Sequence, residues 1–529
     1  MATVTETLKL GLAQHQAGQL SAAEPIYRQI LDEQPDYPNA LHLLGVLLSQ
    51  TGRSQEGAQL IERAVVLDPL QAVYHGNLGW AYWVCGRYLD ASAELEQAIR
   101  LNPNYPDAYF NRGRVHHKLG RLDEAEASLR LCLQSQPRRA DALALLGQVL
   151  QEMSRFAEAR QCYAEAISLG STTPGILHNL GLMLQGEGHL AEAIQQYDQA
   201  LSLDPAFAPA LANRGLALLS LGDFAAGWAG YEHRGGCPDF ERPRFPDPPW
   251  DGSPLAGRRL LVHCEQGLGD TLQFIRYVKL LEPRGGEVII AAQKALVPLL
   301  TQSGYARVLD REETLPEFEV HAPLLSMPRI FRTELDSVPR DVPYLAAEPA
   351  RISFWGGELD KYPGFKVGIA WRGDKGYRLD QWRSIPLGSF APLAQISSVR
   401  LLSLQKDSTS EDLAAIADRF AVVDLARSLD NVGGAFLDTA AVMKNLDLVV
   451  TCDTAIGHLA GALGVPVWLA LPQPSDWRWM VDRTDSPWYP TMRLFRQTTN
   501  GDWDGVFIRI QAELAKVAGG APPNDSEEP

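Results

Sequence analysis

The sequence predicts an array of α-helical repeats followed by an α/β region with parallel sheets. Three observations support this prediction. Small residues recur every 34 residues through the first 230 positions, prolines crowd the stretch 235–257, and short apolar runs then alternate with helical patterns. The 529 residues are also too many for one hydrophobic core, so two or three domains are expected.

The 34-residue period appears in four separate series. Glycine occupies positions 11, 45, 79, 113, 147, 181 and 215, and a second series of Gly or Ser occupies 18, 52, 86, 120, 154, 188 and 222. Other small residues occupy 23, 57, 91, 125, 159, 193 and 227, and prolines occupy 35, 69, 103, 137 and 205. Small residues let two antiparallel helices approach closely, glycine permits the turn between them, and proline ends the second helix.

This pattern resembles the tetratricopeptide repeat, whose helix pairs stack into a superhelix because no pair buries its apolar face alone. We count six full repeats and a seventh that degrades near 228–236, so the predicted array spans residues 1–235.

Asparagines recur two residues before the first glycine of several repeats, at Asn77, Asn111, Asn179 and Asn213. Side-chain amides bind a peptide backbone without selecting its sequence. The series resembles the asparagine ladder of repeat-bearing protein glycosyltransferases, which implies an acceptor protein or peptide in the groove. The alternative is that asparagine is simply common at this position of the repeat.

A linker is predicted at 236–256, and the α/β region after it divides into halves at 257–350 and 364–500. A proline-rich crossing at 339–363 joins the two halves, a helix follows at 501–518, and residues 519–529 are predicted to be a disordered tail. Strands are expected at 259–264, 287–292, 366–371, 400–404, 421–424, 446–451 and 465–471. Helices are expected at 270–281, 411–418, 439–445, 456–463 and 503–517.

Composition excludes several classes of protein. The net charge of −16 argues against a nucleic-acid binder, although a local basic pocket for a small anion remains compatible with it. The sequence has no run of about 18 apolar residues, so it predicts no membrane span. Residues 1–9 lack the features of a signal peptide, and a cytoplasmic location is therefore expected. The six cysteines form no C-x-x-C pair, which argues against a zinc site or a disulfide framework.

The strongest local signal is the stretch 453–467, which begins Asp453-Thr454-Ala455-Ile456-Gly457-His458. It follows an apolar strand and opens a helix, where unpaired backbone amides and the helix dipole favour an anion such as a nucleotide-sugar phosphate. Thr454 can cap the helix and donate to a phosphate, and Asp453 can order the loop or accept from sugar or ribose hydroxyls. The alternative is that one of them is a plain N-cap.

The same stretch resembles the D-T/S-x-x-x-H-L-A-x-A-L-G-x-P segment of heptosyltransferase-type enzymes, glycosyltransferase family 9. The resemblance covers about 260–495 and implies a GT-B fold of two Rossmann-like halves. It also implies transfer from a nucleotide sugar without a metal or other cofactor. Residues 374–377 and 383–386 depart from the D-K-x-W-P stretch usual in the family, which argues against heptose as the donor sugar.

The resemblance continues in Gly267-Leu268-Gly269-Asp270, directly after the first strand. It implies that Asp270 is the general base, because an acceptor hydroxyl needs a carboxylate or imidazole beside it. His263 and Glu265 compete for that catalytic role, and the alternative for Asp270 is that it caps its helix.

Cations at strand ends suit the charge of a leaving nucleotide. Arg372, Arg383 and Lys406 are the main candidates, and Lys375 and Arg378 are weaker ones. The predicted donor-binding set is Gly267, Gly269, Trp371, Arg372, Arg383, Lys406, Asp453, Thr454, Ile456, Gly457 and His458. The aromatic-rich segment 472–497 resembles that of repeat-fused members of the family, and its rings either stack on a base or sugar or pack in the core.

The predicted function is therefore sugar transfer from a nucleotide sugar to a hydroxyl, on Ser or Thr of a protein recruited by the repeats. Bacterial repeat-fused flagellin glycosyltransferases imply flagellin as one such acceptor and CMP-linked nonulosonic acids as donors. Two alternatives remain: a protein-interaction scaffold with an inactive transferase domain, and a nucleotide-sugar epimerase.

Overall fold

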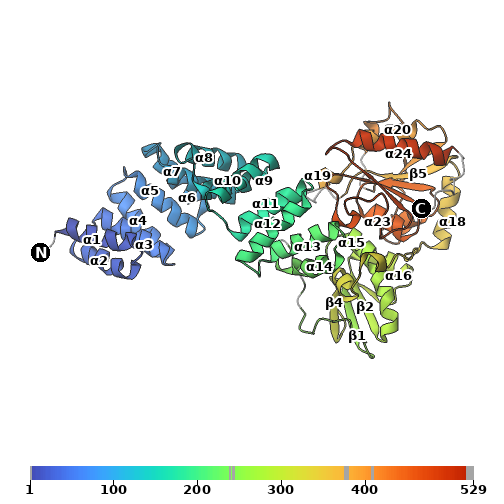
Figure 1. The fold of residues 1–529 in the computed structure, drawn as a ribbon, viewed down its shortest axis with the longest axis horizontal. Helices are drawn as coiled ribbons and strands as arrows, with labels where there is room; N and C mark the ends of the chain where they lie inside the picture. The colour runs from blue at the N-terminus through green and yellow to red at the C-terminus, as the bar shows by residue number, and fades with distance from the viewer. Residues whose placement is uncertain are drawn as a thin grey trace. The chain divides into compact units, whose positions relative to one another are not determined.

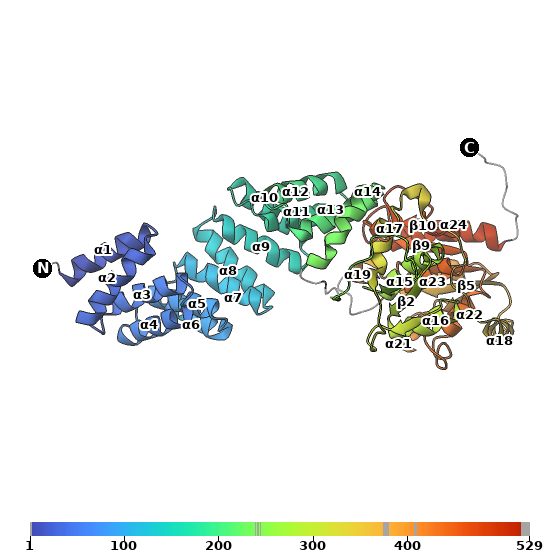
Figure 2. The same cartoon turned by 90° about the horizontal axis from the view of Figure 1, so that it is seen from below.

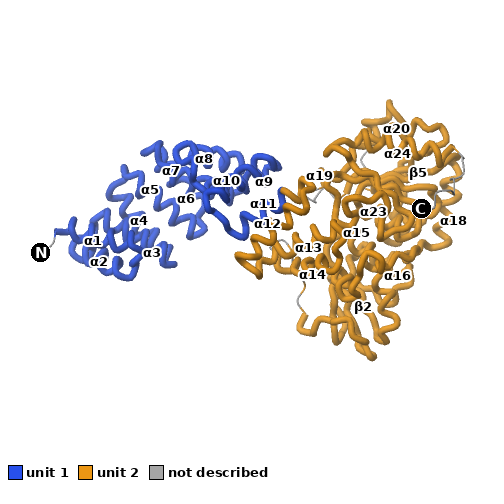
Figure 3. Tube along the Cα trace, in the orientation of Figure 1, with its two compact units in different colours: residues 1–183 blue, residues 184–529 orange. Residues whose placement is uncertain are grey.

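The computed structural model describes residues 3–237, 240, 243, 245–373, 380–406 and 410–519. The chain forms two compact units, residues 1–183 and residues 184–529 (Figure 3). The boundary lies inside helix α11 (Pro174–Gly186), so the last repeats belong to the same unit as the α/β region.

Helices account for the whole repeat region, and successive helices pair (Figure 1). They are α1 (Val4–Gln16), α2 (Leu20–Glu33), α3 (Pro38–Gln50), α4 (Ser54–Leu67), α5 (Ala72–Val84), α6 (Tyr88–Leu101), α7 (Pro106–Lys118), α8 (Leu122–Ser135), α9 (Ala140–Glu152), α10 (Phe156–Ser168), α11, α12 (Leu190–Leu203), α13 (Ala208–Ser220) and α14 (Phe224–Tyr231).

The two glycine series have the structural roles that their spacing predicts. A Cβ on Gly113 would lie 2.7 Å from Cγ of Leu129, so only glycine lets α7 approach α8 this closely. In the second series, Gly120 has a φ of +73°, a left-handed conformation that glycine adopts without steric cost. Ser154 takes the same turn position with a φ of 61°, so the substitution in that series does not change the turn.

The seventh helix pair is incomplete, as predicted. Helix α14 has only 8 residues and continues as the 3-10 helix η1 (Glu232–Gly236). Its Trp228 contacts Phe274, Trp477 and Trp488 of the α/β region, with ring centroids 5.3–6.4 Å apart. The last repeat therefore shares a hydrophobic core with the α/β region.

The first sheet has four parallel strands in the order β3-β2-β1-β4. They are β1 (Arg259–His263), β2 (Glu287–Ala292), β3 (Val308–Asp310) and β4 (Val320–Pro323). Strand β1 pairs with β2 and β4, so the loop after β1 leaves the middle of the sheet.

The second sheet has six parallel strands in the order β10-β9-β8-β5-β6-β7. They are β5 (Phe365–Ala370), β6 (Val399–Ser403), β7 (Val423–Asp424), β8 (Leu448–Thr451), β9 (Val467–Leu471) and β10 (Met492–Arg496). The chain builds one side from β5 to β7 and then returns to build the other side from β8. The carboxyl ends of β5 and β8 therefore flank a topological switch point, where ligands of open α/β sheets bind.

The helices of the α/β region lie between and beside these strands. They are α15 (Leu268–Phe274), α16 (Val297–Gln302), α17 (Met327–Ile330), α18 (Pro349–Leu359), α19 (Asp380–Arg383), α20 (Ala391–Ala394), α21 (Ser410–Ala414), α22 (Leu437–Met443), α23 (Ala455–Ala462) and α24 (Trp503–Ala518). The 3-10 helices are η2 (Ile275–Arg284), η3 (Lys294–Leu296), η4 (Leu324–Ser326), η5 (Leu335–Ser337), η6 (Leu387–Phe390) and η7 (Trp477–Trp479). Helices α15 and α23 pack side by side, which brings together the loops after β1 and β8 (Figures 1 and 2).

Some elements differ from the sequence prediction. The predicted helix 270–281 is α15 followed by η2, which contains Pro283, and the predicted crossing at 339–363 contains helix α18. Strands β3, β4 and β10 were not predicted. The predicted tail lies almost wholly outside the described residues, which end at 519.

No helix in the described part of the chain has both the length and the apolar character that crossing a membrane requires.

Candidate active site

The loop after β8 presents Asp453 and Thr454 at the start of α23. Thr454 occupies the N-cap position with extended backbone (φ −143°, ψ 173°), yet its side chain makes no capping hydrogen bond. Thr454 is therefore the N-cap residue by position, as the alternative interpretation holds, but its side chain does not cap the helix. Its hydroxyl is buried and has no hydrogen-bond partner among the described residues. A buried hydroxyl in this position is an unsatisfied donor at the positive end of a helix.

Asp453 is a carboxylate in an enclosed and charged environment. Burial raises its pKa to about 6, and the negative charge of Asp476 adds to the shift, whereas Arg478 and Arg383 oppose it. This pKa places the change between the acid and the carboxylate close to neutral pH, which is common at functional sites.

His458 lies in the second turn of α23 and is buried. Its Nδ1 lies 2.9 Å from the hydroxyl of Tyr489, its ring stacks on Trp479 at 5.4 Å, and its Nε2 is 3.8 Å from Oδ1 of Asp453. Burial and nearby arginines lower its pKa well below the usual range, so the ring is neutral.

Asp270, in the first turn of α15, faces the same region. Its Oδ2 accepts a hydrogen bond from the backbone N–H of Gly267 at 2.8 Å, and its Oδ1 forms an ion pair with Arg478. Asp270 therefore does cap its helix, as the alternative interpretation holds, and it also contacts a cation from the other half of the α/β region. Burial raises its pKa, and the Arg478 guanidinium opposes that shift.

The two glycines before Asp270 differ in their roles. A Cβ on Gly269 would lie 2.9 Å from Cδ2 of His458, so this glycine permits the close approach of α15 to α23. Gly267 has an ordinary φ of −82°, and a Cβ there would meet only Oδ2 of Asp270, at 3.1 Å.

Arg478, which was not among the predicted site residues, joins the two halves. Besides Asp270, it donates to Gln273 Oε1 at 2.7 Å and to Asp476 Oδ1 at 2.9 Å, and it stacks on the Trp477 ring at 4.6 Å. The signal for it was a cation inside the aromatic run Asp476-Trp477-Arg478-Trp479.

The other two candidates for the base, His263 and Glu265, contact an aromatic cluster and an arginine of the last repeat, respectively. His263 contacts the rings of Phe245 and His321 at 5.1 and 5.5 Å, in an aromatic cluster at the end of β1. Glu265 accepts two hydrogen bonds from Arg234, at 2.8 and 3.1 Å, so its carboxylate ties the last repeat to the α/β region.

The loop after β5 contributes two arginines. Arg372 pairs with Asp412 at 3.0 Å. Arg383 pairs with Asp380 at 2.9 Å and lies close enough to Asp453 for each to influence the pKa of the other. Of the two, the structure brings Arg383 to the α23 loop.

The remaining donor-site candidates among the described residues contact other residues of the protein. Trp371 is buried in a hydrophobic cluster of the second half, and Lys406 donates to the carbonyl oxygens of Ala426 and Leu429 and to Oδ1 of Asn431. Gly457 and Ile456 belong to the first turn of α23. A Cβ on Gly457 would lie 3.1 Å from Leu469, and Ile456 packs against the main core. Lys375 and Arg378 lie outside the described residues.

Two buried side chains that the sequence analysis missed order the loop after β5. Asp380 accepts hydrogen bonds from Gly373 N at 3.1 Å, Arg383 Nε at 2.9 Å and Ser384 Oγ at 2.7 Å. Gln405 bonds to the backbone of Trp371 and Arg372 at 3.0–3.1 Å.

The asparagine series has different partners along the repeats. Asn77 bonds to His42 at 2.7 Å, Asn179 donates to the Tyr163 hydroxyl at 3.2 Å, and Asn213 donates to the Pro209 carbonyl at 3.0 Å. Asn111 alone of the four makes no hydrogen bond through its side chain to the described part of the chain.

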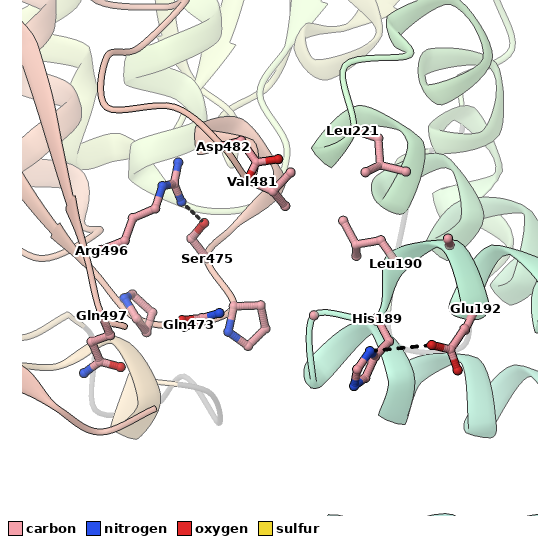
Figure 4. Close-up of a pocket in the computed structure, with 14 residues that line it drawn as sticks. His189, Leu190, Glu192, Leu221, Gln473, Ser475, Val481, Asp482, Arg496 and Gln497 are labelled. Atoms are coloured by element: carbon pink, nitrogen blue, oxygen red, sulfur yellow. Dashed lines mark hydrogen bonds and ion pairs between the residues drawn. The ribbon is translucent and has the colours of Figure 1, made fainter. Parts of the chain in front are cut away.

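A cavity of about 490 Å³ lies beside this region, within the unit 184–529 (Figure 4). One wall is the start of α12 and Leu221 at the end of α13, and the other is formed at the carboxyl ends of β9 and β10. Its lining includes His189, Leu190, Glu192, Gln473, Ser475, Asp482, Arg496 and Gln497. Segments 472–475 and 481–482 of this lining flank residues 476–479, which contact Asp270 and Asp453.

No cluster of three or more His, Cys, Asp or Glu side chains suited to a metal ion occurs among the described residues.

Family comparisons match both parts of the chain. Tetratricopeptide-repeat models match residues 14–78, 85–120, 106–139, 140–169 and 186–222. The model of glycosyltransferase family 9 (heptosyltransferase) matches residues 372–476, a segment that includes Arg383, Asp453 and Thr454 but not Asp270.

Individual relatives cover parts of the chain. Protein FlbA of Caulobacter vibrioides is 28% identical, over 56% of this chain and 53% of that protein, so the chain spans about half the length of this curated relative. Among solved structures, PilF of Pseudomonas aeruginosa is 19% identical with a TM-score of 0.37, covering 39% of this chain and 94% of PilF. YrrB, described as a TPR protein with an unusual peptide-binding site, is 20% identical with a TM-score of 0.32, covering 36% of this chain and 98% of YrrB.

The chain thus combines tetratricopeptide repeats with a glycosyltransferase family 9 domain.

Proposed function

We propose that this protein is a glycosyltransferase that moves a sugar from a nucleotide-sugar donor to a serine or threonine hydroxyl of a protein. The repeats recruit that acceptor protein, and flagellin is the acceptor implied by the resemblance to bacterial repeat-fused enzymes. The observation that carries the proposal is the buried, unpartnered hydroxyl of Thr454 at the amino end of α23, inside the family 9 segment.

A donor phosphate satisfies the groups that converge at this helix end. The first-turn amides of α23 and the Thr454 hydroxyl donate hydrogen bonds, and Arg383 contributes positive charge from the neighbouring loop. These protein groups compensate the charge of the leaving nucleotide, which is the role that a metal plays in other transferases.

The two carboxylates take different roles in the proposed reaction. Asp270 removes the proton from the acceptor hydroxyl as that oxygen attacks the sugar carbon and the bond from the sugar to the phosphate breaks. Asp453, at the donor side, accepts hydrogen bonds from hydroxyls of the sugar. Burial raises the pKa of both groups, and the Arg478 guanidinium opposes the shift in each.

Donor entry requires movement of the segment 476–479. Trp479 stacks on His458, and Arg478 binds Asp270, so this segment packs on one residue assigned to the donor and on the proposed base. Because the Thr454 hydroxyl is fully buried, a phosphate reaches it only when these side chains shift. The adjoining cavity against α12 offers space on the other side of the same segment.

The contact between the repeats and the transferase region supports a protein acceptor. Trp228 of the last helix pair packs against Trp477, the residue next to Arg478, with centroids 5.3 Å apart. The buried Arg234–Glu265 pair joins the same helix pair to the loop before α15, the helix that carries Asp270. An acceptor held by the repeats is thereby delivered next to the proposed base.

A transfer assay tests this function. The full chain is incubated with flagellin and with UDP-, GDP-, ADP- or CMP-linked radiolabelled sugars, and label is measured in the protein fraction. We expect label from one class of donor and none with Asp270→Asn. Folded protein that transfers no label and binds no nucleotide would contradict the proposal and favour the scaffold. Conversion of a donor into its epimer without acceptor would favour the epimerase.

A further inference from the structure

One face of α7 in the unit 1–183 carries an amide and two cations. Gly113 packs against Leu129 of α8, and Asn111, two residues earlier, lies about 200° around the helix, so it faces away from α8. Arg114 and Lys118 follow Asn111 by three and seven residues and therefore lie on the same side. We call Asn111, Arg114 and Lys118 the α7 stripe.

Arg114 is fixed in place by aromatic rings and has no acidic partner. Its guanidinium lies 3.6 Å from the centroid of Trp83 and 5.7 Å from that of Phe110. Within the described part of the chain it makes no ion pair and no hydrogen bond. Stacking fixes the plane of the guanidinium and leaves the N–H groups at its edge available for an acceptor. Partial burial lowers its pKa, and Asp141 opposes that shift.

The lack of a partner sets Arg114 and Lys118 apart from three arginines of the same unit. Arg130, Arg139 and Arg155 each pair with two acidic side chains. Neither Lys118 nor Asn111 has a side-chain partner among the described residues. Asp141 is near enough to act on the pKa of Arg114 but forms no ion pair with it. In a chain of net charge −16, two neighbouring cations that form no ion pair with a carboxylate of the described residues make a local site for an anion.

The spacing of the stripe fits an extended chain. Cβ atoms three or four residues apart on a helix are about 5–6 Å apart. Alternate residues of an extended peptide lie on one side, about 6.6 Å apart at 3.3 Å per residue. Two alternate acidic side chains can therefore reach Arg114 and Lys118 together, while the amide of Asn111 binds the peptide backbone.

We propose that the α7 stripe binds an acidic, extended segment of a partner polypeptide through alternate carboxylates. The identification of this partner as the acceptor rests on the proposed function, whereas the binding itself does not.

Fluorescence anisotropy with the full chain tests the site. The probe is a fluorescein-labelled ten-residue peptide of alternating Glu and Thr, and the matched control peptide replaces each Glu by Gln. We expect the acidic peptide to bind at least about tenfold more tightly than the neutral one, because hydrogen bonds between charged groups are the stronger ones. Its affinity falls as salt rises.

Variants assign the effect to the stripe. Arg114→Gln is expected to weaken binding of the acidic peptide about tenfold, and Arg114→Lys, which keeps the charge, weakens it less. The control is Arg121→Gln, which removes the same charge from an exposed residue at the N-cap of α8 and is expected to leave binding unchanged. Melting temperatures confirm that each variant folds.

Equal binding of the two peptides, or wild-type affinity in Arg114→Gln, would overturn the proposal. Release of nucleotide from a sugar donor is measured in parallel and is expected to be the same in Arg114→Gln and wild type. A loss of peptide binding is thus separable from a failure of the transferase function, since the anisotropy measurement involves no sugar.

Discussion

At the scale of single residues, the ionised Asp453 carboxylate is predicted to lower the stability of the fold while being required for sugar transfer. Its pKa is about 6 in the folded protein, against an ordinary value of 3.8. Between these two pH values the Asp453 carboxyl is therefore protonated in the folded state and ionised in the unfolded chain. Stability therefore falls as pH rises through about 4 to 6, by at most about 3 kcal/mol. We predict that Asp453→Asn raises the melting temperature at pH 7.5 and abolishes most sugar transfer.

The pH dependence provides the control for this prediction. Well below pH 3.8 both states of the wild type are protonated, so the melting temperatures of wild type and Asp453→Asn should converge as the pH falls. A difference that stays constant from pH 4 to 7.5 would contradict the raised pKa.

Asp270→Asn separates capping from catalysis. Asparagine can still accept the hydrogen bond from Gly267 N, so the fold is expected to persist. Loss of the base is expected to lower the transfer rate by roughly 100-fold or more. Transfer rates are measured with saturating donor, and a variant with wild-type turnover would remove Asp270 from the role of base.

Glu265→Gln is predicted to act on stability. It leaves Arg234, which is only 4% exposed, without the carboxylate that accepts two of its hydrogen bonds. Breaking a buried pair in this way costs about 3 kcal/mol, which a lower melting temperature reports. Unchanged stability with lost transfer would instead support Glu265 as the base.

Site residues near strand ends could be predicted because they lie in sequence motifs. The residues that contact them could not be predicted. Asp453 and Thr454 lie just after an apolar strand, Asp270 opens the helix that follows another, and the packing of α15 on α23 brings them together. Arg478 lies 208 residues from Asp270 in the chain, and no periodicity in the sequence relates the two. Lys406 was predicted to bind the donor because it lies at a strand end, but in the structure it donates to backbone carbonyls of Ala426 and Leu429.

At the scale of elements, the contact between α15 and α23 is predicted to depend on Gly269. A Cβ there meets the His458 ring at 2.9 Å and Ala455 Cα at 3.7 Å, so Gly269→Ala forces the helices apart and is expected to cost about 1–3 kcal/mol. The matched control is Gly357→Ala in α18, where a Cβ meets nothing within 4 Å and helix propensity favours alanine by about 1 kcal/mol. Thermal melting should move in opposite directions for the two variants, and equal shifts would refute the close approach.

The repeat helices were predictable because two glycine series and one proline series report the same period. Strands β3 and β4 are only 3 and 4 residues long, too short for an alternating pattern to stand out. Strand β10 reads Met-Arg-Leu-Phe-Arg, and its two arginines hide it among the charged residues around it. Helix α18 was missed because the prolines that flank it suggested a crossing, although Pro349 itself occupies the first turn, where proline is tolerated.

At the scale of the whole molecule, the change of period in the sequence does not coincide with the division into compact units. The proline-rich stretch 236–256 suggested a linker between the repeats and the α/β region, yet Phe224 and Trp228 before it pack with Trp488 after it. Amphipathic periodicity shows that a helix buries one face but does not identify what covers it. The last repeats are thus part of the same compact unit as the α/β region.

Nucleotide binding is the most direct test of the central claim that the α23 helix end holds a donor phosphate. Isothermal titration of the full chain with UDP, GDP, ADP and CMP should reveal binding of at least one nucleotide. Thr454→Val, which removes the buried hydroxyl but keeps its shape, should weaken that nucleotide about tenfold, whereas the exposed Thr498→Val should not. Folded protein that binds none of the four, or equal affinity in wild type and Thr454→Val, would contradict the account.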